Sequence, residues 1–76
     1  MEKAIIIGVN TLSEDYVFLD EIEELKNLCL ACDVEIVDVI TQNLNYINPS
    51  TYVGKGKIEE IKITIQSLDI EALVFN

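Results

Sequence analysis

The sequence predicts a small, layered α/β domain with a largely parallel sheet of three or four strands and two amphipathic helices. Apolar, β-branched runs at residues 3–9 and 34–41 alternate with segments at 14–32 and 58–67 in which apolar residues recur every three or four positions. The chain has 76 residues, half of them hydrophobic. This size allows one domain with a small core, and the composition excludes a disordered chain.

The first strand and the first helix are predicted from residues 3–32. Residues 3–9 are apolar almost without interruption, which is typical of a central parallel strand covered on both faces. Ser13 is the expected N-cap of an acidic helix that ends near Cys32. The apolar stripe of this helix consists of Phe18, Ile22, Leu25, Cys29 and Cys32.

The rest of the chain is predicted to add two strands and a helix. Residues 34–41 form a second strand, which we expect to be less enclosed than the first because it carries two acidic residues. Residues 42–50 form an exposed loop rich in asparagine. A short strand at 51–53 then leads through a glycine turn into a helix from Ile58 to about Ser67, and a last strand lies near 71–75.

The segment from Pro49 to Ile61 contains the most informative motif. Gly54 and Gly56 can adopt backbone angles closed to other residues, so we expect a sharp turn between Val53 and Ile58. Two glutamates follow in the first turn of the predicted helix, where the helix dipole favours negative charge. The pattern is that of a strand, a glycine turn and a helix.

This motif resembles the signature of the N-terminal domain of the HflX family of translational GTPases. The matching string is Thr51-Tyr52-Val53-Gly54-Lys55-Gly56-Lys57-Ile58-Glu59-Glu60-Ile61, preceded by Thr41-Gln42 and a loop that contains a proline. The other elements follow in the family's order, so the resemblance covers nearly all 76 residues. At the end of the first helix the family usually has a glycine and this chain has Cys32-Asp33, where aspartate tolerates a left-handed cap less well than glycine.

The resemblance implies that residues 1–76 are the N-terminal α/β domain of a longer protein. In the family the polypeptide continues into a helical hairpin and a P-loop GTPase domain, which hydrolyses GTP with magnesium and engages the large ribosomal subunit. The N-terminal region contributes to ribosome contact and to the regulation of nucleotide turnover. Residues 1–76 contain no GTPase element, so we expect no bound cofactor, no catalytic residue and no GTP hydrolysis here.

Six motif residues are candidates for a contact with phosphate, RNA or another domain. They are Thr51, Tyr52, Gly54, Lys55, Gly56 and Lys57. Backbone amides at a helix start can hold an anion and the lysines add charge, but Lys57 is followed by Ile58, so this is no Walker A sequence. The alternative is a structural turn in which the Tyr52 ring packs under the glycines and its hydroxyl finds a polar partner.

Two further functions remain open. A small nucleotide- or ligand-binding module would use loops at the carboxyl ends of the strands, with Asn10, Thr11, Thr41, Gln42, Gly54 and Gly56 as its residues. An interaction domain would associate with itself or with the rest of its own chain, and uncovered apolar surface at a sheet edge predicts such a homo-oligomer.

The cysteines and the clustered acids offer weaker candidates. Cys29 and Cys32 form a C-x-x-C pattern at a helix C-terminus, where the dipole disfavours a thiolate, so core packing is favoured over redox chemistry. A zinc site would need two more ligands, and the chain has no histidine. The acids at 20–24 are expected to form a solvated or protein-binding helix face and not a metal site.

The charge distribution limits the partners. The net charge is −9, and residues 1–38 carry ten acids against two lysines. Free-standing affinity for nucleic acid is therefore not expected, and any contact with RNA would be local to Lys55, Lys57 and Lys62. No apolar run approaches the roughly 20 residues needed to span a membrane, and no signal peptide pattern is present, so we expect a cytoplasmic protein.

Overall fold

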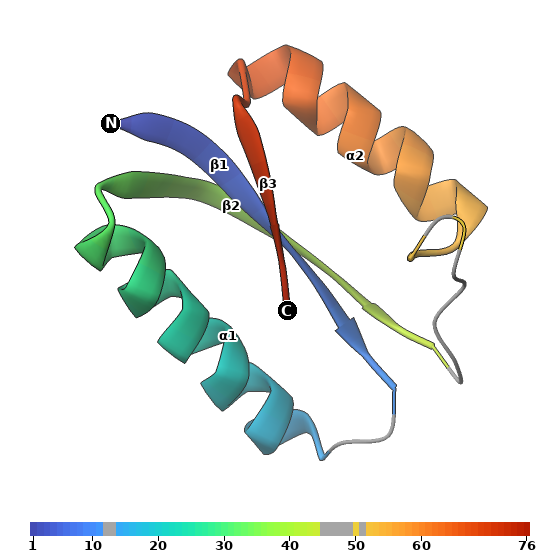
Figure 1. Ribbon diagram of the computed structural model, residues 1–76. Helices are drawn as coiled ribbons and strands as arrows, with labels where there is room; N and C mark the ends of the chain where they lie inside the picture. The colour runs from blue at the N-terminus through green and yellow to red at the C-terminus, as the bar shows by residue number, and fades with distance from the viewer. Residues whose placement is uncertain (12–13, 45–49, 51) are drawn as a thin grey trace.

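The computed structural model describes residues 1–11, 14–44, 50 and 52–76. Its elements are β1 (Glu2–Asn10), α1 (Asp15–Ala31), β2 (Val34–Asn43), α2 (Lys55–Leu68) and β3 (Ala72–Phe75). The described strands form one parallel sheet in the order β2-β1-β3. The predicted α/β fold is confirmed. The helices lie on opposite faces of the sheet, a point that the sequence left open (Figure 1).

Strand β1 lies at the centre of the sheet, as its continuous apolar run predicts. It pairs along its whole length with β2 and through residues 4–7 with β3. Every residue of β1 from Ala4 to Asn10 is buried, whereas in β2 only Ile40 is. A parallel strand with neighbours on both sides and a helix over each face loses contact with water on all sides, which explains its composition.

The core has two layers, one on each face of β1. On the α2 face, Ile5, Ile7 and Val9 cluster with Ile61 of α2 and neighbouring residues. On the α1 face, Ile6 packs against Phe18 and Ile22 of α1. The alternation follows from the two-residue period of a strand.

Gly8 lies on the α1 face of the sheet, beneath the side chains of Ile22 and Phe18. A Cβ atom at this position would lie 2.8 Å from Cδ1 of Ile22 and 3.0 Å from Cζ of Phe18. Any larger residue would therefore force the side chain of Ile22 or Phe18 out of its place in the core.

At the N-terminus of α1 the predicted cap is wrong, and at its C-terminus the left-handed aspartate is confirmed. The N-cap is Glu14, and Ser13, the predicted cap, lies outside the described residues. Asp33 has a φ of 62°, so aspartate does take the left-handed position after the helix. Cys29 is buried as predicted, but Cys32 is exposed, because the helix ends at Ala31 and Cys32 no longer follows the apolar stripe.

The start of α2 differs from the prediction. The helix begins at Lys55, three residues before Ile58, with Gly54 as its N-cap. None of the three glycines has a positive φ, and Tyr52 takes the left-handed conformation instead, with a φ of 69°. The predicted glycine turn is therefore wrong in its residues: the bend before α2 lies at Tyr52 and Val53.

The short strand predicted at 51–53 is also wrong, because its two described residues are not part of the sheet. Tyr52 and Val53 form a bend outside the sheet, and Thr51 lies outside the described residues. Val53 is apolar because its side chain is buried in the core layer under α2. β3 occupies the sheet position beside β1 instead.

Candidate functional site

The motif segment 52–57 lies at the carboxyl ends of the parallel strands. Gln42, near the end of β2 and paired with Val9 of β1, accepts a hydrogen bond through Oε1 from the Gly54 N–H at 2.9 Å. A Cβ atom on Gly54 would lie 3.1 Å from Nε2 of Gln42. A larger residue at position 54 would crowd the Gln42 carboxamide, which would have to shift by a few tenths of an ångström, and the hydrogen bond to Gln42 connects the start of α2 to the end of β2.

Tyr52 and Asn76 form a hydrogen-bonded centre at the same edge. The Tyr52 hydroxyl lies 2.9 Å from the main-chain oxygen of Asn76 and 3.0 Å from Oδ1, so it donates to these two acceptors. The ring of Tyr52 meets Phe75 edge to face, with the centroids 5.1 Å apart. The predicted polar partner of the hydroxyl is therefore present, and the ring packs on Phe75.

Asn76 also extends the pairing between β1 and β3. Its Nδ2 donates to the Val9 carbonyl at 3.1 Å, and the Val9 N–H donates to its Oδ1 at 3.0 Å. The carboxamide thus replaces a peptide group in the sheet beyond the last paired residue of β3. Sequence reasoning did not single out Asn76, although a carboxamide directly after a strand was a signal that could have been followed.

The lysines of the motif lie in the first turn of α2. Lys55 and Gly56 are exposed. Lys57 is less exposed and forms an ion pair with Glu60 at 3.0 Å. The carbonyl of Gly54 accepts from the N–H groups of residues 57 and 58, as a helix start requires. The six candidate residues therefore divide into structural contacts (Tyr52 and Gly54) and accessible groups (Lys55, Gly56 and Lys57), with Thr51 outside the described part.

The residues of the motif do not fit a site for GTP or magnesium. The N–H of Gly54 is engaged by Gln42, and Glu59 and Glu60 lie in the same two turns of α2 as the lysines, where they would repel phosphate. Within the described ranges, no group of three or more histidine, cysteine or acidic side chains could hold a metal ion. The GTP chemistry that the resemblance implies is therefore not assigned to these residues.

The residues of the alternative ligand site are dispersed along the carboxyl edge. Asn10 is buried at the end of β1, and Thr11 and Thr41 are exposed. Gln42 and Gly54 contact each other directly. The shallow hollow on this side is lined by residues of α1 and β2, including Thr41 but none of the motif residues.

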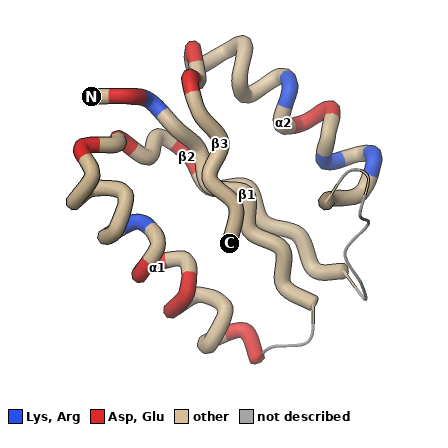
Figure 2. The backbone as a smooth tube through the Cα atoms, viewed as in Figure 1, with Lys and Arg blue, Asp and Glu red and all other residues tan. Residues whose placement is uncertain are grey.

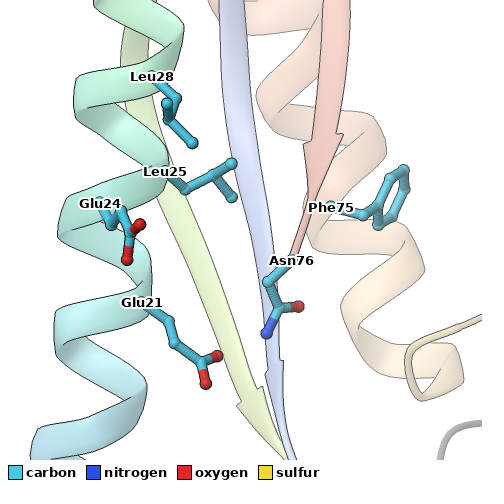
Figure 3. A pocket seen from close by; sticks show the side chains of 6 residues that line it. All are labelled: Glu21, Glu24, Leu25, Leu28, Phe75 and Asn76. Atoms are coloured by element: carbon cyan, nitrogen blue, oxygen red, sulfur yellow. The ribbon is translucent and has the colours of Figure 1, made fainter.

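The acids of α1 lie on its exposed side, as predicted. Lys26 pairs with Glu23 at 3.1 Å, a weak surface interaction. Glu21 and Glu24 line a groove between α1 and the end of β3 (Figure 3). A second, more apolar groove separates α2 from β3 on the opposite face of the sheet.

In the described part of the chain, no helix has the length and apolar character needed to cross a membrane.

Comparison with known proteins identifies the family. A model of the family "GTP-binding GTPase N-terminal" matches residues 19–76, which include α1 from Leu19 onward, β2, the motif segment, α2 and β3. The chain belongs to this family. It is the domain found at the N-terminus of HflX proteins, as the resemblance of the motif predicts.

Curated relatives extend the match over the N-terminal strand. The chain is 34% identical over 76 residues to the GTPase HflX of Alkalihalophilus pseudofirmus, covering all of this chain and 18% of the relative. It is 44% identical over 75 residues to the GTPase HflX of Lacrimispora saccharolytica, covering 96% of this chain and 17% of the relative. The GTPase HflX of Caldanaerobacter subterraneus is 31% identical over 75 residues, a match that covers 99% of this chain and 17% of the relative. The chain therefore spans less than a fifth of the length of these HflX relatives.

Proposed function

We propose that this chain is the N-terminal domain of a longer HflX-type GTP-binding protein of the cytoplasm. In that protein it contacts the large ribosomal subunit and regulates nucleotide turnover. GTP and magnesium are bound by a separate P-loop domain beyond residues 1–76. The family match over residues 19–76 carries the proposal. The geometry of the motif supports it, because Tyr52 and Gly54 serve the fold while Lys55 remains accessible.

The ribosome contact is proposed for the lysines of α2. This helix carries Lys55, Lys57 and Lys62 against two glutamates, whereas α1 on the opposite face carries five acids and one lysine (Figure 2). RNA is a polyanion, so the acidic α1 face repels it and the α2 face is the only favourable approach offered by the two helices. Because the chain as a whole has a net charge of −9, the contact is local and is supplemented by other parts of the protein.

Charge reversal of Lys55 and Lys57 in the full-length protein tests this contact. The double variant Lys55→Glu/Lys57→Glu is expected to bind the large ribosomal subunit more weakly. If each lysine contacts one phosphate, the slope of log K against the logarithm of the salt concentration should become smaller in magnitude by about 2. The GTP turnover of the free protein is expected to stay within about twofold of wild type, because the residues lie outside the nucleotide site. Binding is measured by sedimentation with ribosomal subunits at several salt concentrations.

Lys26→Glu is the matched control. Lys26 lies on the acidic helix α1 and is paired with Glu23, so its reversal is expected to leave ribosome binding unchanged. Unchanged binding by the Lys55/Lys57 double variant would overturn the proposed contact. A thermal shift of the 76-residue chain with GTP, GDP or ATP would instead favour the ligand-binding module, whose loops would lie at the carboxyl ends of the strands.

A further inference from the structure

A groove lies on the α1 face of the sheet, between α1 and β3. Its walls are Glu21, Glu24, Leu25, Leu28, Phe75 and Asn76, and it encloses about 230 Å³. Figure 3 shows Glu21 and Leu25 extending from α1 toward the strands, while the ring of Phe75 turns away toward α2. The four α1 residues follow the spacing i, i+3, i+4 and i+7, so they form one continuous stripe along the helix.

This stripe shares Leu25 with the core-facing side of α1 and extends from it to the exposed side chain of Leu28. Leu28 is 58% exposed, although it lies beside the partly buried Leu25. Glu21 and Glu24 have no ion-pair or hydrogen-bond partner within the described residues, since Lys26, the only basic residue of α1, is paired with Glu23. Two leucines bordered by two unpaired carboxylates complement a surface that presents apolar and cationic side chains together.

The position of the groove favours a helix as the occupant. It runs beside α1 and over the edge strand of the sheet, on a face whose only described helix is α1. In layered α/β folds a second helix packs at this place, about 8–10 Å from the first helix axis. An extended segment would instead pair with the free edge of β3 and leave the groove open.

We propose that a basic amphipathic helix from a later part of the same polypeptide docks in this groove. Its apolar side covers Leu25 and Leu28, and its lysine or arginine residues face Glu21 and Glu24. The inference rests on the proposed function, because it takes residues 1–76 to be part of a longer chain, as in relatives of which they span 17–18%. A tethered helix has an effective concentration in the millimolar range, which favours it over helices of other proteins.

Carbodiimide cross-linking of the full-length protein tests the charge contact. This reagent joins a carboxylate to an amine that it touches, so Glu21 or Glu24 is expected to link to lysines outside residues 1–76. Glu59 and Glu60 of α2 are internal controls, because they are close to Lys62 and Lys57 respectively and should link within α2. Mixing isotope-labelled with unlabelled protein distinguishes links within one polypeptide from links between two copies.

A pair of leucine variants tests the apolar contact. Leu28→Asp and Leu30→Asp alter residues of the same helix that are 58% and 62% exposed, and only Leu28 lines the groove. In the 76-residue chain, both variants are expected to unfold at similar temperatures. In the full-length protein, Leu28→Asp is expected to lower the midpoint of thermal unfolding of this domain by at least about 4 °C more than Leu30→Asp.

Equal midpoints for the two full-length variants would overturn the inference, as would cross-links only between copies or only to ribosomal proteins. These results would leave the proposed function intact, provided that the full-length protein still binds ribosomes and hydrolyses GTP. A full-length protein that lacks both activities, yet shows the internal cross-links, would overturn the proposed function alone.

Discussion

At the scale of single residues, the motif is held by one tyrosine and two carboxamides. Tyr52 adopts a left-handed backbone conformation that costs a residue with a side chain of order 1 kcal/mol. Its hydroxyl and ring recover this cost through Asn76 and Phe75. Gln42 holds the Gly54 N–H. The motif therefore fastens the beginning of α2 to the ends of all three described strands.

Removal of the Tyr52 hydroxyl is expected to destabilise the domain. Tyr52→Phe keeps the ring contact and loses the hydrogen bonds to Asn76, so the free energy of unfolding should fall by about 0.5–1.5 kcal/mol. Urea denaturation followed by circular dichroism measures the change. Tyr16→Phe is the control, because Tyr16 is 69% exposed, and an equal loss in both variants would contradict the role assigned to Tyr52.

At the scale of elements, the ends of the helices decide which side chains are accessible. Both helices are followed by an aspartate in the left-handed conformation, Asp33 and Asp69. After α1 this reversal begins at Cys32, so the two cysteines of the C-x-x-C pattern separate into a buried and an exposed thiol. A C-x-x-C redox pair takes its reactive thiolate from a helix N-terminus, whereas both of these cysteines lie at the C-terminal end of α1. The arrangement favours packing for Cys29 and leaves Cys32 as a surface residue.

Cys32 is therefore expected to react with a maleimide much faster than Cys29. In native protein, mass spectrometry should find one rapidly added label on Cys32, and the label on Cys29 should appear only at the rate of local or global unfolding. Addition of urea should bring both rates close together. Equal labelling of both cysteines in native protein would show that the end of α1 is open or differently placed.

At the scale of the whole molecule, the sheet is asymmetric in how well it is covered. β1 is enclosed, but β3 is a four-residue edge strand with the half-exposed side chains Leu73 and Phe75 on its α2 side. Such an edge is a template for pairing with another strand. Opposing this, each copy has a net charge of −9. The balance of the two effects sets the oligomeric state of the isolated domain.

Self-association of the 76-residue chain is expected to increase with salt. Ionic strength of 0.15 M shortens the Debye length to about 8 Å and weakens the repulsion between acidic copies, while the apolar edge is unaffected. Leu73→Lys should reduce association because it places charge beside the edge, whereas Leu68→Lys, at a residue that is similarly exposed but lies on α2, should not. Sedimentation equilibrium at several salt concentrations measures both effects. A monomer at all concentrations would contradict the prediction.

The sequence alone determined the order of the main elements, the central place of β1 and the family. These features depend on local periodicity and on contiguous residues: the uninterrupted run at Ile5–Ile7 demands burial on two faces, and the string at 51–61 needs no contact to be recognised. The left-handed Asp33 was predictable for the same reason, since a helix end has few ways to turn.

Only the tertiary structure decided how the motif works. Periodicity cannot tell a short strand from a bend that buries one side chain, so Val53 was assigned to the sheet, although it packs beneath α2. The freedom of glycine suggested Gly54 and Gly56 as the turn, but the left-handed residue is Tyr52, whose hydroxyl bonds to Asn76 directly after β3. Hydrogen bonds between residues that are 24 or 67 positions apart in the sequence depend on how the strands assemble, and no local sequence pattern predicts them.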